Sequence, residues 1–515
     1  MFIKTFGSTV YGIEAITITI EVNWTAQGKD YCIVGLPDNS IKESMQRVES
    51  AIKSNGFEMP RTRIVVNLAP ADLKKSGTAF DLPIAIGVLA ASEQLKFSQR
   101  LSDHILMGEL SLDGELRSIR GALPIAIQGR KEGFKGLIVP DTNAKEAAMV
   151  NGLNVYGLRS LKEVVDFIRN DGNNSTPIKI DVEKEFYQSQ IKFETDFSEV
   201  KGQENIKRAM EIAAAGGHNV ILIGPPGAGK TMLAKRLPSI LPPLSLEESL
   251  ESTKIHSVAG KLPEHTSLIT KRPFRSPHHT ISDVALVGGG STPQPGEISL
   301  AHNGVLFLDE LPEFKRTVLE VMRQPIEERK VTISRARIAI DFPTSFMLVA
   351  SMNPCPCGFY NHPEKKCTCP PGLVTKYLNK ISGPLLDRID LHLEVTPVAF
   401  SQLASHQITE KSEAIRERVI AARKIQTQRY AENPGIYSNA QMGPRELKII
   451  CQLDEPAQIL LKKAMERLNL SARAYNRILK VARTIADLGN DQHIMTEHIA
   501  EAIQYRNLDR EGWGG

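Results

Sequence analysis

Eight consecutive residues near the middle of the chain have the types and spacing needed to hold the phosphates of a nucleotide. They follow the apolar run Asn219–Ile223, which is typical of a buried strand, and they lead into a helical stretch. Glycines in such a loop let successive backbone N–H groups surround phosphate oxygens, while a lysine reaches the terminal phosphates and a hydroxyl binds Mg²⁺. The eight residues are Gly224, Pro225, Pro226, Gly227, Ala228, Gly229, Lys230 and Thr231. We therefore predict that this loop binds ATP and Mg²⁺, with Lys230 on the phosphates and Thr231 on the metal.

Two adjacent carboxylates could supply the second half of such a site. The apolar run Val305–Leu308 predicts a strand, and Asp309 and Glu310 follow at its carboxyl end, the edge where parallel sheets bind ligands. We expect Asp309 to hold Mg²⁺, directly or through water, and Glu310 to orient and activate the attacking water. Without a phosphate-binding loop upstream, two acids after a strand would more often cap a helix.

Hydrolysis of ATP also needs a contact to the γ-phosphate and positive charge near the transition state. A third strand-like run, Phe346–Ala350, ends close to Asn353, whose amide could position the water. Arg388 could act as an arginine finger on the nucleotide of a neighbouring subunit, and Arg473 could sense nucleotide from a carboxyl-terminal helical segment. Taken alone, either arginine would more often form a surface salt bridge.

Four of the six cysteines lie together in the segment 355–369. Cys355 with Cys357 and Cys367 with Cys369 form two pairs on either side of a polar loop, so four thiolates could converge on one tetrahedral Zn²⁺. The single residue within each pair departs from the commoner two-residue spacing. Two alternatives stay open, namely a closed structural zinc site that braces the segment after the third strand, or four reduced cysteines in a loop.

The elements that must position these residues fall into four parts. With 515 residues, the chain is long enough for roughly three or four domains. Residues 1–171 mix strand-like and helix-like segments and predict an independent α/β domain, and residues 172–196, rich in turn-forming residues, predict a linker. Residues 197–397 predict an α/β ATPase core, and residues 398–515 predict a helical lid. In the first part the strand-like segments are Ile16–Val22, Arg63–Leu68 and Gly136–Pro140, and the helix-like segments are Ser40–Asn55 and Ala144–Val150.

The composition of the chain argues against a disordered, a secreted or a membrane-spanning protein. Hydrophobic residues make up 41% of the chain and charged residues 24%, which is ordinary for a globular protein and unlike a disordered one. No signal-peptide pattern opens the chain, and the apolar run Leu82–Ala91 falls well short of the ~20 residues that cross a bilayer. We therefore expect a cytoplasmic protein with no membrane partner. The net charge of +4 is too small to establish a nucleic-acid partner, so that inference must come from local basic patches.

Beyond these motifs, four stretches resemble the magnesium-chelatase-like AAA+ ATPases usually called YifB or ComM, and the resemblance covers nearly the whole chain. The stretches are Arg272–His279, Leu286–Gly290, Pro295–His302 and Ser471–Leu488, and they are far more specific than the phosphate-binding loop. The resemblance implies a multidomain α/β protein with a central AAA+ core and a carboxyl-terminal helical lid.

The resemblance also implies how the chain assembles and what it acts on. It implies a homo-oligomeric ring, a hexamer, with Arg388 as the finger in trans and Arg473 as the second sensor. It also implies that Val200, Gly202 and Gln203 lie near the adenine. For the competence proteins of this family, the implied activity is ATP-driven translocation on single-stranded or branched DNA, as a helicase that promotes branch migration in recombination.

Local charge suggests where DNA could bind. Basic residues flank two strand-like runs, Val331–Ile333 and Ile338–Ile340, and predict a hairpin that could line the pore of a ring and contact backbone phosphates without reading sequence. The basic residues are Arg329, Lys330, Arg335 and Arg337. The alternative is a solvated hairpin balanced by Glu327 and Glu328. The glycine- and proline-rich segment 288–296 is a second candidate for the pore.

The first domain resembles the Lon protease domain, which implies a ribosomal S5 domain 2-like α+β fold. The resemblance lies in Val66–Pro70 and in Met107–Leu116. Lon proteases cut peptides with a serine whose proton is taken by a lysine. In this sequence Ala79 stands near the expected serine and Leu123 near the expected lysine, so both catalytic groups are missing.

A substitute pair is the alternative for that domain. Ser76 follows Lys74 and Lys75, but adjacent lysines in a turn are usually solvated. We therefore predict a non-proteolytic domain that serves ring assembly or DNA contact.

Three functions remain to be separated. The leading hypothesis is a DNA-translocating ATPase, the second is a chelatase-like motor that remodels a protein or loads metal into a tetrapyrrole, and the third is an ATP-dependent protease. The missing serine and lysine weigh against the third. His278 and His279 have no acidic or cysteine partner near them in the sequence, so we expect them to be structural rather than metal ligands.

Overall fold

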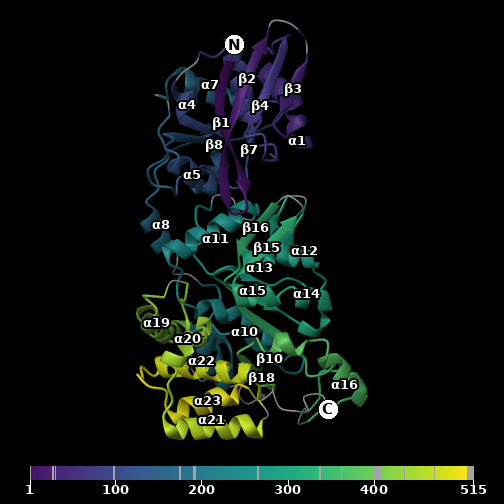
Figure 1. The fold of residues 1–515 in the computed structure, drawn as a ribbon, viewed down its shortest axis with the longest axis vertical. Coiled ribbons are helices and arrows are strands. Elements are labelled where there is room, and N and C mark those ends of the chain that lie inside the picture. Colours follow the sequence, from purple (N-terminus) through teal and green to yellow (C-terminus); the bar gives the residue numbers. More distant parts are fainter. Residues whose placement is uncertain are drawn as a thin grey trace.

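The computed structural model describes residues 2–506 apart from several short segments. The segments outside the description are residues 26–27, 29, 97–98, 173–174, 190–192, 264–265, 291, 336–337, 361, 363, 399–408, 434 and 469. An amino-terminal α/β region, a central region with a parallel sheet and a carboxyl-terminal helical region follow one another along the long axis of the molecule (Figure 1).

The amino-terminal region is built on a mixed seven-stranded sheet in the order β3-β4-β2-β1-β5-β8-β9. Its strands are β1 (Phe2–Tyr11), β2 (Glu14–Thr25), β3 (Tyr31–Val34), β4 (Arg63–Ala69), β5 (His104–Leu106), β8 (Gly136–Pro140) and β9 (Asn154–Leu158), beside the short pair β6 (Glu109–Leu110) and β7 (Leu116–Arg117). Its helices are α1 (Asn39–Lys42), α2 (Ser44–Ser54), α3 (Asp81–Ala91), α4 (Gln99–Asp103), α5 (Ala122–Lys131), α6 (Asp141–Ala147) and α7 (Leu161–Arg169). Every residue of α3 is buried, which explains why the run Leu82–Ala91 is apolar on all sides.

The stretch predicted as a linker, residues 172–196, contains the helix α8 (Val182–Ser189). Val182 and Phe186 are buried in an apolar cluster that also takes in Ala122 from the first region and Leu244 and Leu268 from the core. The stretch therefore packs at the junction of the two regions instead of crossing it as free chain.

The central sheet has five parallel strands in the order β11-β14-β17-β10-β18. The strands are β10 (Val220–Ile223), β11 (Phe274–Arg275), β14 (Val305–Leu308), β17 (Met347–Met352) and β18 (Leu391–Glu394). All residues of β10, β14 and β17 are buried, as expected for a parallel sheet with helices on both faces. Because the strands run the same way, the loops at their carboxyl ends meet at one edge.

The remaining core elements surround this sheet and extend it toward the amino-terminal region. The helices are α9 (Glu204–Gly216), α10 (Lys230–Arg236), α11 (Leu246–Val258), α12 (Asp283–Val287), α13 (Glu297–Leu300), α14 (Arg316–Glu320), α15 (Arg323–Glu328), α16 (Pro371–Leu378) and α17 (Gly383–Leu386). The short strands β12 (Gly288–Gly289) and β13 (Gln294–Pro295) pair with each other, as do β15 (Lys330–Arg335) and β16 (Ile338–Pro343). In Figure 1 the hairpin β15–β16 and helix α11 lie next to the amino-terminal region.

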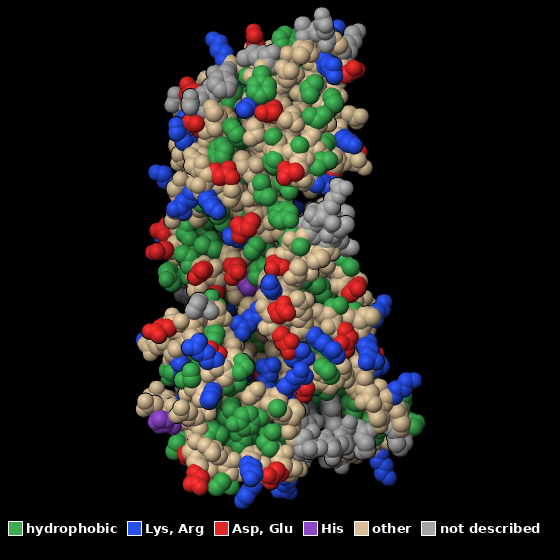
Figure 2. All heavy atoms as spheres, viewed as in Figure 1, with side chains coloured by type: hydrophobic (Ala, Val, Ile, Leu, Met, Phe, Trp, Pro, Cys, Tyr) green, Lys and Arg blue, Asp and Glu red, His purple; other side chains and the backbone are tan. Residues whose placement is uncertain are grey.

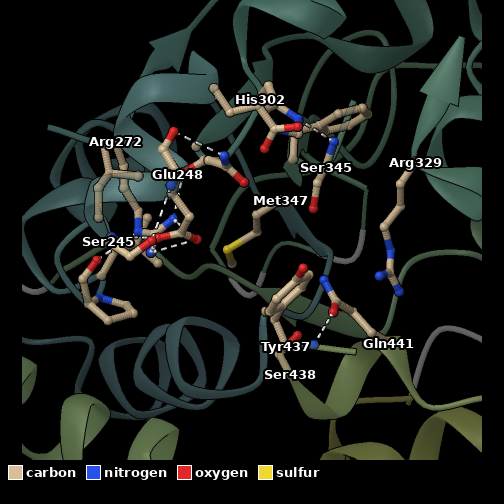
Figure 3. Close-up of a pocket in the computed structure, with 18 of the residues that line it drawn as sticks. Ser245, Glu248, Arg272, His302, Arg329, Ser345, Met347, Tyr437, Ser438 and Gln441 are labelled. Atoms are coloured by element: carbon tan, nitrogen blue, oxygen red, sulfur yellow. Dashed lines mark hydrogen bonds and ion pairs between the residues drawn. The ribbon is translucent and has the colours of Figure 1, made fainter. Parts of the chain in front are cut away.

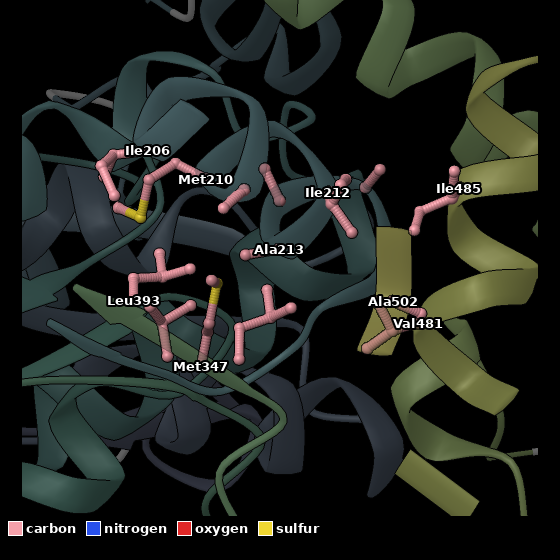
Figure 4. Packing of buried hydrophobic residues seen from close by; sticks show 14 of the residues in the cluster. Ile206, Met210, Ile212, Ala213, Met347, Leu393, Val481, Ile485 and Ala502 are labelled. Carbon is pink, nitrogen blue, oxygen red and sulfur yellow. The ribbon is translucent and has the colours of Figure 1, made fainter. Parts of the chain in front are cut away.

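The carboxyl-terminal region is helical and shares one packed interior with the core. Its helices are α19 (Ser412–Arg429), α20 (Pro444–Ile450), α21 (Glu455–Arg467), α22 (Ala472–Leu488) and α23 (Thr496–Gln504). Figure 4 shows the cluster passing from the sheet through α9 to the lid, with Met347, Leu393, Ile206, Met210, Ile212, Ala213, Val481, Ile485 and Ala502 labelled. Truncating a large side chain of this cluster to alanine costs roughly 2–5 kcal/mol of unfolding free energy, so the lid is held to the core by ordinary core packing.

The visible surface carries acidic and basic side chains intermingled over all three regions, with no single basic face (Figure 2). Any contact with a polyanion on this face must therefore depend on local groups. No helix among the described residues is both long enough and apolar enough to pass through a bilayer.

Candidate nucleotide site

The phosphate-binding loop lies at the carboxyl edge of the central sheet, between β10 and α10. A Cβ atom on Gly224 would lie 2.1 Å from the carbonyl oxygen of Val395, so only glycine fits where the loop leaves β10. Gly227 and Gly229 have positive φ angles of 78° and 88°, which glycine adopts without strain. The loop backbone therefore has the conformation that the motif requires, with α10 starting at Lys230.

The side chain of Lys230, the first residue of α10, is buried against the phosphate-binding loop. Its Nζ donates to the carbonyl oxygens of Gly224 (2.7 Å) and Pro225 (3.0 Å) and to Asn353 Oδ1 (3.0 Å). Burial lowers the pKa of Lys230, while the nearby carboxylates of Asp309 and Glu310 raise it less. A buried cation that is hydrogen-bonded only to neutral oxygens is well prepared to accept the charge of a phosphate group.

Asp309 and Thr231 meet at the same edge. Thr231 Oγ1 donates to Asp309 Oδ2 at 2.9 Å, and Ser351 Oγ donates to the other carboxylate oxygen. The register explains this contact, because Leu308 pairs with Ala350 and the next residue of each strand then projects from the same edge. These hard oxygen donors fit Mg²⁺, which prefers a few carboxylate or hydroxyl oxygens and keeps waters and phosphate oxygens as its other ligands.

Glu310 stands just beyond Asp309 in a left-handed backbone conformation, with φ 55°. Its N–H donates to Asp309 Oδ1 at 3.1 Å, and its side chain is 56% exposed. Its Oε2 lies 3.7 Å from His279 Nδ1. The backbone of Glu310 is therefore fixed, while packing leaves the orientation of its carboxylate open.

The segment before α9 lies against the phosphate-binding loop. Gln203 Nε2 donates to the carbonyl oxygens of Ala228 and Thr396, both at 2.9 Å. Gly202 and Gln203 have positive φ angles of 63° and 58°, and Val200 is buried. Gln203 thus borders the phosphate-binding loop, with Gly202 and Val200 next to it in the chain.

Arg388 and Arg473 lie together at the other edge of the sheet. Arg388 precedes β18, which begins beside the start of β10, and its carbonyl oxygen accepts from Asn219 Nδ2 at 3.1 Å. Its Nη2 lies 2.7 Å from Glu327 Oε1, and Arg473 Nη1 lies 3.2 Å from Asp387 Oδ2. Both arginines line one hollow of about 160 Å³.

This placement separates both arginines from the nucleotide site of their own chain. The four residues of β10 span about 13 Å at ~3.3 Å per residue, with the phosphate-binding loop at the far end. Arg473, which we expect to sense nucleotide from the lid, lies beside Arg388.

The four clustered cysteines converge. Their sulfur atoms all lie within 4.8 Å of one another, with separations of 3.3 Å between Cys355 and Cys357, 3.7 Å between Cys355 and Cys367, and 3.5 Å between Cys357 and Cys367. Four sulfurs at 2.3 Å from a tetrahedral Zn²⁺ would be about 3.8 Å apart. The donor set and its spacing therefore fit zinc, and they leave no open coordination position.

A hollow of about 740 Å³ lies away from the nucleotide site. It lies between core and lid at the amino edge of the sheet, where Gly217, Gly304 and Met347 stand at the starts of strands. Figure 3 shows Arg272 paired with Glu248, at 3.0 Å, on one side and Arg329 on the other. Charges of both signs line the hollow, so it has no clear preference for an anion.

The basic hairpin is partly neutralised and clamped. Lys330 pairs with Asp341 at 3.1 Å, and Arg329 turns away from the hairpin to donate to the carbonyl oxygen of Gly435. The apolar side chains of β15 and β16 pack against Tyr11 and Ile13 of the amino-terminal region and against Val287. Arg337 and the side chain of Arg335 lie outside the described residues. The hairpin therefore offers fewer free cations than the sequence suggested.

The positions that correspond to the missing protease groups are apolar and close together. Leu123 is fully buried, and Ala79 packs against the same cluster. Lys75, however, is fully buried and donates to the carbonyl oxygens of Gly35 (3.1 Å) and Pro70, so the expectation of a solvated lysine was wrong for this residue. Its amine is occupied by the backbone carbonyls of the residues that directly follow β3 and β4, not by a hydroxyl.

Sequence reasoning missed two residues of the nucleotide site. Ser351 could have been found, because it occupies the same place after β17 that Asp309 occupies after β14. His279 was expected to be structural, and its approach to Glu310 gave no local signal, since the two residues are far apart in the chain.

Three family models match the chain in succession. A model described as subunit ChlI of Mg-chelatase matches residues 20–143, one described as magnesium chelatase, subunit ChlI, matches residues 196–403, and one described as magnesium chelatase, subunit ChlI C-terminal, matches residues 409–506. The second match contains the phosphate-binding loop, both acids of the site and the four cysteines.

Full-length relatives also match. The competence protein ComM of Haemophilus influenzae is 44% identical over 505 residues, covering 97% of this chain and 96% of the relative. The uncharacterized protein YifB of Escherichia coli is 44% identical over 501 residues, with the same coverage of each chain. Lon protease 2 of Bacillus subtilis is 32% identical over 154 residues, which are 27% of this chain and 26% of the protease.

Proposed function

Because this chain belongs to the ComM/YifB family of magnesium-chelatase-like AAA+ proteins, we propose that it is a ring-forming ATPase motor that moves along DNA. The family supports an AAA+ ATPase-like motor and implies ATP with Mg²⁺ as its ligands. The observation that carries the ATPase assignment is the convergence of Lys230, Thr231, Asp309 and Asn353 at one edge of the sheet. The DNA substrate is supported by the relative named as a competence protein.

Each residue of the site has a distinct role in this proposal. Lys230 leaves its carbonyl partners to bind the terminal phosphates. Thr231 and Asp309 would hold Mg²⁺, which would neutralise phosphate charge. Glu310 accepts a proton from the attacking water, and the amide of Asn353 positions that water against the γ-phosphate. Gln203 with Val200 and Gly202 borders the adenine. The loop, the acids and the amide together preorganise the reacting groups, which is the main source of catalysis in phosphoryl transfer.

The position of the arginines supports a ring. Arg388 and Arg473 lie at the sheet edge opposite their own phosphate-binding loop, so the nucleotide that they can reach is that of a neighbouring protomer. Their carboxylate partners, Glu327 and Asp387, hold them in the isolated protomer. The family resemblance implies a homo-oligomeric ring of six protomers. In such a ring, the phosphates of the neighbour's nucleotide would replace the two carboxylates as partners of the arginines.

Two adjacent loops are the proposed contact with DNA. The glycine loop 288–296 and the hairpin β15–β16 form one unit, because Val287 packs on the hairpin and a Cβ on Gly288 would lie 2.9 Å from Ile333. Contacts from such loops to backbone phosphates are independent of sequence, which suits single-stranded or branched DNA. The amino-terminal region clamps the hairpin through Tyr11 and Ile13, so a non-proteolytic, supporting role fits this Lon-like domain.

A labelled four-way junction tests the proposal. We expect the assembled protein to convert the junction to branch-migrated products with ATP, and to leave it intact with a non-hydrolysable analogue. The Lys230→Ala variant should be inert because it cannot hold the terminal phosphates. If an assembled ring hydrolyses ATP but leaves both junctions and forked duplexes intact, a protein-remodelling motor would be favoured instead.

We also propose that the four cysteines hold a structural Zn²⁺ that braces the phosphate-binding loop. Cys355 follows Asn353 closely, and Gly358 in the same segment packs on Pro226, where a Cβ would lie 2.4 Å from the proline ring. The thiolates would hold the metal and thereby fix this segment against the loop. The metal would have no chemical step to perform, because a site closed by four thiolates leaves no position for substrate.

The double variant Cys367→Ser/Cys369→Ser should lose one zinc per chain and should have a higher dissociation constant for ATP. The reason is that the loop containing Gly358 would no longer hold Pro226 in place. Metal analysis of the purified protein and titration with a fluorescent ATP analogue measure the two effects. Cys32→Ser is the matched control, since Cys32 is exposed and lies in the amino-terminal region. Purified wild-type protein without zinc, or a double variant that retains it, would refute the site.

A further inference from the structure

His279 faces the proposed catalytic carboxylate from the segment that leads to the glycine loop. Its Nδ1 lies 3.7 Å from Glu310 Oε2, and its ring packs edge-on against Phe314, with 6.4 Å between ring centroids. The separation from Glu310 is longer than a hydrogen bond. Catalytic contacts are often this long before the reacting complex assembles, so a small movement would make the bond.

The carboxylate of Glu310 needs such a partner. Its backbone is fixed by the N–H contact to Asp309, but the side chain is 56% exposed and packing does not choose its orientation. The oxygen of a base must lie within about 3 Å of the oxygen whose proton it accepts. A protonated Nδ1 of His279 can donate to one carboxylate oxygen and leave the other to face the water.

The chain connects His279 directly to the proposed DNA contact. Ser282 caps α12, with its Oγ accepting from Ala285 N at 3.1 Å, and α12 ends at the glycine loop. Leu286 is fully buried in the cluster beneath Asp309 and Glu310, while Val287 packs on the hairpin β15–β16. Helix α12 therefore has one contact in the catalytic half of the core and one in the DNA-contacting loops. A shift of those loops must move the segment that carries His279.

We propose that His279 is a positioning residue that couples DNA contact to the orientation of Glu310. The inference rests on the proposed DNA-dependent activity of the same site. Contact of DNA with the glycine loop and the hairpin moves α12 and its preceding segment, the imidazole bonds to the carboxylate, and the carboxylate turns to the attacking water. His279 touches neither phosphate nor metal in this account, so it affects turnover and leaves nucleotide binding unchanged.

The test compares four full-length proteins, namely wild type, His279→Ala, His279→Asn and His493→Ala. For each we would measure kcat for ATP with and without a single-stranded oligonucleotide and a four-way junction, and the dissociation constant for ATP. His279→Asn retains a donor close to the position of Nδ1 and tests rescue by a conservative change. His493→Ala is the control, because His493 is an exposed histidine between α22 and α23 of the carboxyl-terminal region, whereas the ring of His278 packs on that of His279, with 4.1 Å between ring centroids.

We expect the ratio of DNA-stimulated to basal kcat to fall to about one in His279→Ala, with ATP affinity unchanged. This ratio should recover in part in His279→Asn and stay at the wild-type value in His493→Ala. Full stimulation in His279→Ala would overturn the inference, and so would a parallel loss of ATP affinity in both His279 variants, which indicates a structural role. A wild-type protein that no DNA stimulates would instead overturn the proposed function, and the coupling with it.

Discussion

We expect the Glu310→Gln variant to bind ATP as the wild type does and to hydrolyse it roughly 10²–10⁴-fold more slowly. Glutamine keeps the size of the side chain but cannot accept the proton of the attacking water. The phosphate-binding contacts of Lys230 and Thr231 do not involve Glu310, so the bound state should survive. A fluorescent ATP analogue measures binding, and release of inorganic phosphate measures turnover.

Glu313→Gln is the matched control for that prediction. Glu313 lies in the turn that follows Glu310 and is similarly exposed, but its carboxylate lies 3.5 Å from Lys380. It should leave turnover near the wild-type value. If Glu310→Gln hydrolysed ATP normally, the assignment of the catalytic base would be wrong.

The second large effect concerns Arg388. Arg388→Ala should lower kcat by roughly 10³–10⁵-fold, the range known for arginine fingers, while ATP binding to the same protomer is retained. The arginine lies at the opposite edge of the sheet from its own nucleotide site, so its loss should act across the subunit interface.

Mixing separates action in trans from action within one chain. Lys230→Ala protomers keep Arg388 but cannot bind ATP, and Arg388→Ala protomers bind ATP but lack the finger. Co-assembled rings of the two should regain activity that neither variant shows alone. If rings are shown to contain both variants and are still inactive, Arg388 does not act on the neighbour's nucleotide. Wild-type activity of the Arg388→Ala protein would contradict the same hypothesis.

The elements of the core could be predicted from sequence because their signals are local. The apolar run Val305–Leu308 coincides with β14, and the run Asn219–Ile223 contains β10. In the amino-terminal region Gly136–Pro140 coincides with β8, and Arg63–Leu68 falls within β4. Buried parallel strands are apolar throughout and are bounded by turn residues, so their bounds are visible without tertiary information.

The contacts between distant segments could not be predicted in the same way. His279 reaches Glu310 only because the segment before α12 crosses the end of β14, and Arg473 reaches the neighbourhood of Arg388 only through the packing of α22 on the core. Lys75 was misjudged because its buried amine is held by the carbonyl groups of Gly35 and Pro70, which are distant in the chain or separated by a turn and give no local signal. Helix α8, within the stretch predicted as a linker, could not be predicted either, because it is stabilised by apolar neighbours from two other regions.

The measurement that tests the central claim most directly is steady-state ATP hydrolysis by the assembled protein without DNA and with single-stranded DNA, duplex DNA or a four-way junction. Glu310→Gln sets the background. The account predicts stimulation by DNA, strongest with single-stranded or branched forms. A rate that no DNA changes, from protein shown to be assembled, would contradict a DNA motor and point to a motor that remodels proteins.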